Sequence, residues 1–273
     1  MEYCGQFTNG GRGMPKQDAI TNQREQEILR EIKLAGGSCR IGFLARKLNV
    51  SDETIRRNIK SLQTSGLVKK VHGGVSLSGL VSVVAPSFQR RMDKNADAKK
   101  ALAARVAEMI NDGDSLFLDT GSTMAYVAQA LQSHQNLYIV THSASIAQML
   151  TGRNNNRVFL AGGELRALDG AAFGQDTLAY IKRFNVQYAL LSVAAINAHS
   201  GFMLYDIQEA DISCEAIKRA QMSIVVADDA KFGIRAPITI QAPDAVDMVM
   251  TNATPDERIT AMFAQSDIAL TVI

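Results

Sequence analysis

Apolar positions in the first part of the chain follow a helical period and then give way to short strands. They recur at helical spacing from residue 22 to residue 35, which predicts an amphipathic helix. A second, shorter helix is predicted within 39–48. A third follows Ser51, a good N-cap residue, and stops before Gly66. The segment 67–77 then predicts two short strands joined by a Gly-Gly turn.

The third predicted helix separates apolar from basic side chains. Successive residues of a helix are rotated by about 100° around its axis. Ile55, Ile59 and Leu62 therefore share one face, which we expect to pack in the core. Arg57 and Lys60 point the opposite way, so the outer face of this helix is predicted to be basic.

The order of these elements predicts a winged helix-turn-helix over 22–77, with the helix-turn-helix motif at 39–58. In such a motif the second helix enters the major groove of DNA, and the wing reaches the phosphate backbone. A basic three-helix bundle that binds protein is the alternative. The predicted DNA-binding residues are Ser51, Thr54, Arg56, Arg57, Asn58, Lys60, Lys69, Lys70 and His72.

From residue 96 onward, helical segments alternate with short apolar strands. Strands are predicted at 115–118, 136–140, 157–160, 187–191, 222–226, 246–250 and 268–272. This alternation predicts an α/β domain with a mostly parallel, doubly wound sheet over 96–273. The segment 78–95, low in charge at first and broken by Pro86, is predicted to be a linker, and 1–21 a disordered tail.

Polar loops follow several of these predicted strands. Ligands of doubly wound sheets bind outside the carboxyl ends of the strands, so these loops are candidate ligand-binding segments. Gly121 allows a tight turn into a helix, whose first N–H groups can hold a phosphate together with nearby hydroxyls. A lysine in the loop after 222–226 can neutralise an anion. The loops supply the candidates Asp119, Gly121, Ser122, Thr123, Thr141, His142, Ser143, Gly162, Gly163 and Lys231.

Composition and charge favour some classes of protein and exclude others. The net charge of +2 hides a basic module, because residues 22–77 hold eleven Lys or Arg against five Asp or Glu. No apolar run approaches the roughly 18–20 residues of a membrane span, and the N-terminus lacks the apolar core of a signal peptide. Three cysteines and four histidines are scattered, which argues for a reducing cytoplasm and against a disulfide framework or a metal site. We expect no metal and no cofactor.

Two groups of motifs resemble one known family. LARKLNVSDETIRRNIKSLQTSGLVKKVHGGV resembles the helix-turn-helix and wing of the DeoR family of bacterial sugar-metabolism regulators. LFLDTGST, IVTHS, LAGGELR and VVADDAKFG resemble the effector domain of that family, which is related to ribose-phosphate isomerases. The resemblance covers about residues 22–273, and the segment 160–184 is most similar to the branch that responds to glycerol 3-phosphate.

This resemblance implies a repressor whose affinity for operator DNA changes when a phosphorylated sugar or polyol binds to the Rossmann-like effector domain. It also implies that Glu209 accepts a hydrogen bond from a ligand hydroxyl and that Lys231 neutralises the ligand's charge. We expect such a protein to be a homo-oligomer, either a dimer or a tetramer, because helix-turn-helix proteins span two half-sites.

Three departures from the family's pattern bear on function. Asn58 stands where the family usually has Asp, and His142 replaces a common Asn. Ala194 and Ala195 occupy the positions at which the isomerases carry a pair of acids. Isomerisation of an aldose needs a carboxylate to move a proton between carbons, so the resemblance favours a repressor that is not an enzyme. A sugar-phosphate isomerase with an appended basic domain is the alternative.

Overall fold

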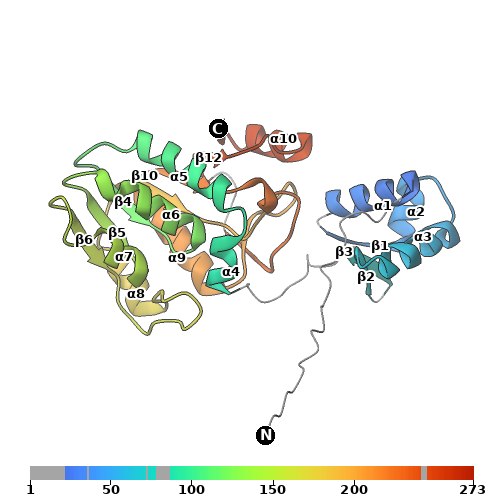
Figure 1. Cartoon of the computed structure of the whole chain (residues 1–273), viewed down its shortest axis with the longest axis horizontal. Helices are drawn as coiled ribbons and strands as arrows, with labels where there is room; N and C mark the ends of the chain where they lie inside the picture. Colours follow the sequence, from blue (N-terminus) through green and yellow to red (C-terminus); the bar gives the residue numbers. More distant parts are fainter. Residues whose placement is uncertain (1–21, 36, 72, 78–86, 241–244) are drawn as a thin grey trace, which may run out of the picture.

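The computed structural model describes residues 22–35, 37–71, 73–77, 87–240 and 245–273 (Figure 1). They form a small domain from α1 to β3 and a large domain from α4 to β13. The predicted tail, His72 and the first half of the predicted linker lie outside the described residues. The prediction of a winged helix-turn-helix followed by a doubly wound α/β domain is confirmed. None of the described helices is long and apolar enough to cross a membrane.

The small domain packs three described helices on an antiparallel sheet with the strand order β1-β3-β2. β1 is not predicted from the sequence. It pairs with β3, where a Cβ on Gly74 would lie 2.4 Å from the carbonyl oxygen of Cys39, so glycine is needed for this close approach. The elements are α1 (Gln23–Leu34), β1 (Ser38–Arg40), α2 (Ile41–Lys47), α3 (Asp52–Thr64), β2 (Val68–Val71) and β3 (Gly74–Leu77).

Local chemistry explains where two of these helices begin. Asn22 and Glu25 form a capping box at the start of α1, with hydrogen bonds of 2.8 and 3.0 Å between their side chains and each other's backbone N–H. Ser51 caps α3 by accepting from the N–H of Thr54 at 3.2 Å, as its sequence position predicts. Both caps satisfy N–H groups that the start of a helix leaves unpaired.

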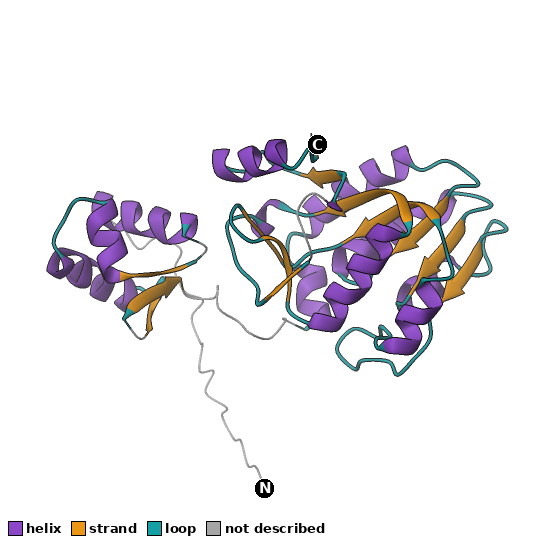
Figure 2. Ribbon diagram, turned by 180° about the vertical axis from the view of Figure 1, so that it is seen from behind, coloured by secondary structure: helices purple, strands orange, loops and turns teal. Residues whose placement is uncertain are grey.

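Among the described residues, the large domain is built on a seven-stranded parallel sheet with the order β13-β12-β10-β7-β4-β5-β6 (Figure 2). Its strands match the predicted ones: β4 (Ser115–Leu118), β5 (Tyr138–Thr141), β6 (Arg157–Leu160), β7 (Val186–Leu191), β10 (Ala220–Val226), β12 (Met248–Thr251) and β13 (Ala269–Val272). A small antiparallel sheet, which the sequence does not predict, contains β8 (Ala195–Asn197), β9 (Gly201–Leu204) and β11 (Ile238–Thr239).

Helices cover both faces of the parallel sheet (Figure 2). On β4, Leu116 and Leu118 face a core formed with α5, α6 and α7, whereas Phe117 faces a core formed with α8, α9 and α10. This alternation is the period of two that a strand imposes on its side chains. The helices are α5 (Ala96–Met109), α6 (Ser122–Ala130), α7 (Ala144–Leu150), α8 (Gln175–Ile181), α9 (Ile207–Lys218) and α10 (Glu257–Gln265), with the shorter α4 (Phe88–Asp93), η1 (Leu131–Ser133) and η2 (Asp229–Lys231).

The strand order reverses at the centre of the sheet. From β4 the chain moves outward through β5 to β6, and it then returns to the other side of β4 to form β7. The connections that leave β4 and β7 therefore run in opposite directions from the same edge of the sheet. Such a reversal opens a crevice at the carboxyl ends of the strands, which is where doubly wound sheets bind ligands.

Candidate functional site

The outer face of α3 is basic and exposed. Arg56, Arg57 and Lys60 are all exposed, whereas Ile55 and Ile59 on the opposite face are 0% and 3% exposed. The predicted division of this helix into a core face and an outer face is therefore confirmed. A row of cations on an exposed helix of a helix-turn-helix motif is suited to the major groove.

The other predicted DNA-binding residues surround this face. Lys69 and Lys70 are exposed on β2. The hydroxyls of Ser51 and Thr54 lie 2.9 Å apart at the start of α3. Asn58 donates from Nδ2 to the carbonyl oxygen of Thr54 at 2.8 Å, so its amide is engaged with its own helix.

In the large domain, a cavity of about 180 Å³ opens where the strand order reverses. It is lined by residues at the carboxyl ends of β4, β7 and β10, together with residues of α4, α5 and α9. The predicted ligand residues that line it are Asp119, Gly121, Ser122, Glu209 and Lys231. The tertiary structure thus brings together residues that are more than one hundred positions apart in the sequence.

The start of α6 forms one wall of this cavity. Gly121 precedes the helix with φ 111°, and a Cβ at this position would lie 2.8 Å from the hydroxyl oxygen of Ser192. Glycine is therefore required both by the backbone conformation and by the close approach of two loops. Ser122 begins the helix, where unpaired N–H groups and the positive end of the helix dipole favour an anion.

Five basic side chains among the described residues line the cavity: Arg91, Lys94, Lys99, Lys231 and Arg235. Burial lowers the pKa of Lys231 to about 8, and burial also lowers the pKa of Lys99. Lys99 donates from Nζ to the backbone carbonyl oxygens of Arg91 and Lys94. The ammonium group of Lys231, in contrast, forms no hydrogen bond or ion pair with any residue that the structure describes.

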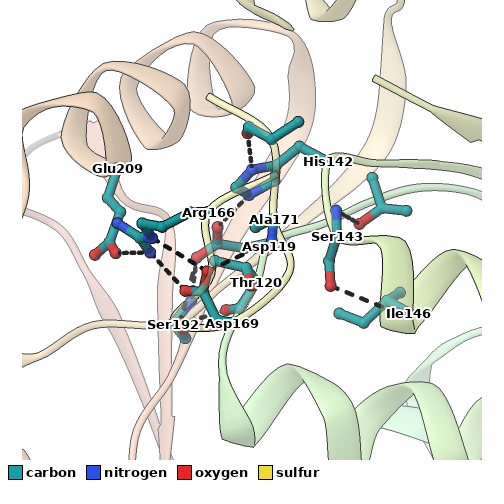
Figure 3. A network of polar contacts seen from close by, with 12 residues as sticks. Asp119, Thr120, His142, Ser143, Ile146, Arg166, Asp169, Ala171, Ser192 and Glu209 are labelled. Carbon is teal, nitrogen blue, oxygen red and sulfur yellow. Dashed lines mark hydrogen bonds and ion pairs between the residues drawn. The ribbon is translucent and has the colours of Figure 1, made fainter. Parts of the chain in front are cut away.

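Each carboxylate that lines the cavity among the described residues has a side-chain partner, and Figure 3 shows those of Glu209 and Asp119. Glu209 accepts from Nη2 of Arg166 at 2.5 Å; burial raises the pKa of Glu209, and this contact opposes the shift. Oδ1 of Asp119 lies 3.1 Å from Nε2 of His142. Asp228 accepts from an asparagine side chain just before α5 at 2.7 Å. The five basic side chains of the lining outnumber these three carboxylates, so the cavity favours an anion.

The remaining predicted ligand residues do not line the cavity. Thr141 ends β5, one strand further from the reversal, His142 and Ser143 follow it, and all three are at most 1% exposed. Oγ1 of Thr141 accepts from the N–H of Ser143 at 3.1 Å, and the Ser143 hydroxyl caps α7. Gly163 packs closely on α8, since a Cβ there would lie 3.0 Å from Oγ1 of Thr177. Thr123 and Gly162 also lie outside the lining.

The basic residues of α4 are absent from the sequence prediction, because it assigns 78–95 to a linker. Nε and Nη2 of Arg91 are buried without a hydrogen-bond partner among the described residues, and Nη2 lies 3.7 Å from Oδ2 of Asp169. The hydroxyl of Tyr126 on α6 donates to a backbone carbonyl oxygen of α4 at 3.3 Å, which holds α4 against α6. The charged run at 90–94 is the signal that distinguishes this stretch from a linker.

Comparison with known proteins agrees with this architecture. Residues 24–78 match the DeoR-like helix-turn-helix domain, and residues 94–253 match the DeoR C terminal sensor domain. The chain is 33% identical over 227 residues to the glycerol-3-phosphate regulon repressor of Escherichia coli, which covers 83% of this chain and 89% of that protein. It is 31% identical over 249 residues to the HTH-type transcriptional repressor CsqR of the same organism, covering 91% and 94%.

Among solved structures, ribose 5-phosphate isomerase from Plasmodium falciparum is similar to 49% of this chain, over 52% of its own chain, with 12% sequence identity and a TM-score of 0.35. The two matched domains together span most of the described residues, in the order helix-turn-helix and then sensor domain. The protein therefore belongs to the DeoR family of DNA-binding transcriptional regulators.

Proposed function

We propose that this protein represses a carbohydrate or polyol operon and that a phosphorylated small molecule, glycerol 3-phosphate or a sugar phosphate, alters its affinity for operator DNA. The observation that carries the proposal is the convergence of five basic side chains, among the described residues, on a cavity at the start of α6. A cavity of this kind favours a compact anion. The relatives named above are repressors, one of them of a glycerol-3-phosphate regulon.

On the DNA side, the exposed face of α3 supplies the specific contacts. Arg56 and Arg57 can each pair bidentately with guanine or with a phosphate, and Lys60 extends the same face. Lys69 and Lys70 on the wing neutralise backbone phosphates, which adds affinity that does not depend on sequence. One such motif reads one half-site, so the working repressor is a homo-oligomer, a dimer or a tetramer.

On the ligand side, the phosphate group lies at the start of α6 and the carbon chain extends toward the apolar part of the lining. The backbone at Gly121 and the hydroxyl of Ser122 contact the phosphate oxygens. Lys231 supplies a cation, and because a nearby anion favours the charged form, binding draws a proton onto this lysine. Glu209 remains paired with Arg166 and accepts a hydrogen bond from a ligand hydroxyl.

The helix α4 connects the ligand to the DNA-binding part of the chain. It is the first described helix of the large domain, and Nε and Nη2 of its Arg91 have no hydrogen-bond partner among the described residues. The Arg91 side chain lines the cavity and is 22% exposed, and a partly buried guanidinium gains from a charge-assisted hydrogen bond to an anion. The ligand therefore contacts α4, which is the first described helix after the small domain.

The cavity offers no free carboxylate among the described residues for the alternative function, that of a sugar-phosphate isomerase. Ala194 lines the cavity and Ala195 is fully buried, so neither position offers a carboxylate. Glu209 is already bound to Arg166 at 2.5 Å, which makes it a poor base. Purified protein that converts ribose 5-phosphate at a rate dependent on Glu209 would support the enzyme instead.

The test measures operator affinity with and without the ester. A binding site is first selected from a pool of random duplexes, and its affinity for the full chain is then followed by fluorescence anisotropy. We expect glycerol 3-phosphate or a sugar phosphate to change this affinity by roughly tenfold or more, as allosteric effectors do. A chain that selects no duplex is not a repressor, and one whose affinity ignores every phosphate ester does not sense them.

A matched pair of variants on α4 sharpens this experiment. Arg91 lines the cavity, whereas Arg90 is exposed on the same helix and does not line it. We expect Arg91→Gln to bind operator normally but to lose most of its response to the ester, and Arg90→Gln to keep both properties. Equal responses in the two variants would show that Arg91 takes no part in ligand recognition.

A further inference from the structure

His142 lies beneath the cavity instead of lining it. Its ring is 0% exposed, stacked with Phe117 at a centroid distance of 6.1 Å and in edge contact with Phe173 at 5.1 Å. The ring joins two parts of the domain. Nδ1 lies 2.9 Å from the carbonyl oxygen of Ala172, and Nε2 lies 3.1 Å from Oδ1 of Asp119, which does line the cavity. Figure 3 shows this contact between the histidine and the aspartate.

Both polar neighbours of this ring are hydrogen-bond acceptors. A carbonyl oxygen has no proton to donate, and neither has an ionised carboxylate. The second oxygen of Asp119 accepts from the backbone N–H of Ser192 at 3.1 Å. A neutral imidazole has a single N–H and satisfies one acceptor, whereas an imidazolium has two and satisfies both. The geometry at His142 therefore matches the imidazolium.

We propose that His142, held as an imidazolium, neutralises Asp119 from below and thereby sets how tightly the cavity binds an anion. This inference rests on the proposed function, in which the cavity holds a phosphate ester. With the proton in place the pair is neutral, and the basic side chains dominate the cavity. Without it, Asp119 places an uncompensated negative charge in the wall. Across a few ångströms at intermediate dielectric, that charge weakens anion binding on the order of tenfold.

No other described cation forms a hydrogen bond that would neutralise Asp119. The guanidinium carbon of Arg166 lies 4.1 Å from the ring centroid of Phe173, which also contacts His142. Arg166 is already committed, however, to Asp169 and Glu209, with N–O distances of 2.5 Å to each. Among the described residues, His142 is thus the one side chain able to carry a positive charge that lies within hydrogen-bond distance of Asp119. It acts through Asp119 and not on the ligand, which makes it a positioning residue.

The first test reads the protonation state of the ring directly. The chain has four histidines, so a protein labelled with ¹⁵N-histidine gives few ring signals, and the signals missing from His142→Asn identify His142. We expect both of its ring nitrogens to carry a proton at about pH 7, where a free histidine is mostly neutral. A bare ring nitrogen at this pH would overturn the proposal. If the Asn variant does not fold, the signals are assigned on the unsubstituted protein by their contacts with Phe117 and Phe173.

The second test measures how anion affinity depends on pH. Inorganic sulfate is the probe, because it keeps its charge where a phosphate ester titrates. The background is Lys231→Arg, since arginine stays charged where the lysine loses its proton. Sulfate affinity is measured by calorimetry from about pH 6 to about pH 9. We expect it to fall by roughly tenfold over this range, and to fall clearly less when His142→Asn is added; the fall that remains reports Lys99, whose pKa burial lowers in both proteins.

His134 provides the matched control. Its Nε2 lies 3.0 Å from two backbone carbonyl oxygens, and it does not line the cavity. His134→Asn should leave the slope of sulfate affinity against pH unchanged. An equal slope with and without His142 would overturn the inference while leaving the anion site intact. A chain that binds sulfate at no pH would instead overturn the proposed function, and with it this inference.

Discussion

Lys231→Met should make the large domain more stable while it abolishes anion binding. In the folded chain, burial lowers the pKa of Lys231 from 10.5 to about 8. Each unit of pKa difference corresponds to about 1.4 kcal/mol, so holding this lysine charged costs the folded state up to about 3 kcal/mol. Methionine has a similar length, carries no charge and fits irregular apolar surroundings. The substitution should therefore raise the free energy of unfolding by up to that amount at neutral pH.

The pH dependence of this gain has a definite sign. Below about pH 8 the lysine is charged in both the folded and the unfolded states, and the full cost of burying the charge is present. Between about pH 8 and pH 10.5 only the unfolded state binds the proton, so the unsubstituted protein gains stability as the pH rises. The advantage of Lys231→Met should therefore shrink across this window and vanish above it.

Tyrosine fluorescence during urea unfolding measures this effect in the full chain. Five of the six tyrosines lie between residues 126 and 205, none lies in 22–77, and the protein has no tryptophan, so the signal reports the large domain. Lys218→Met serves as the control, because Lys218 is exposed at the end of α9, and should change stability by less than about 0.5 kcal/mol. The reasoning is refuted if Lys231→Met is no more stable than the unsubstituted protein at neutral pH, or if its advantage persists above pH 10.5.

Three further substitutions test other parts of the molecule. Arg57→Ala should cost about 1–3 kcal/mol of specific binding in an operator titration. Lys69→Ala should instead weaken binding to all DNA sequences alike and reduce the salt dependence of binding. If both variants bind operator as tightly as the unsubstituted chain, the assignment of α3 to the major groove and of the wing to the backbone is wrong. Ile59→Ala removes a side chain that is 3% exposed and should destabilise the small domain by roughly 2–5 kcal/mol, which calorimetry can detect as a lowered melting transition. Gly121→Val places a branched side chain at φ 111° beside Ser192, and should abolish the response to phosphate esters while operator binding in anisotropy persists; a normal response would place the phosphate elsewhere.

The elements of this protein could be predicted from the sequence because their signals are local. The caps at Ser51, the apolar spacing of Ile55 and Ile59, and the short apolar runs of the parallel strands each depend on neighbours within a few residues. β1 could not be predicted, because three residues are too few to show a periodic pattern of apolar positions. Its place in the sheet also depends on Gly74, which lies more than thirty residues further along the chain. The family resemblance then followed from the motifs in these elements.

Local patterns do not predict which residues line the cavity, since this depends on the order of the strands. Gly121 and Ser143 both follow parallel strands, β4 and β5. Only β4 adjoins the reversal, so only the first of these loops reaches the cavity. Arg91 enters from a short helix in a stretch that has the composition of a linker. His142 is buried beneath the site because Ala172 and Asp119, 53 positions apart, meet on either side of its ring. Periodicity encodes which side of an element is buried; which elements become neighbours is decided by contacts between distant residues, and those exist only in the folded chain.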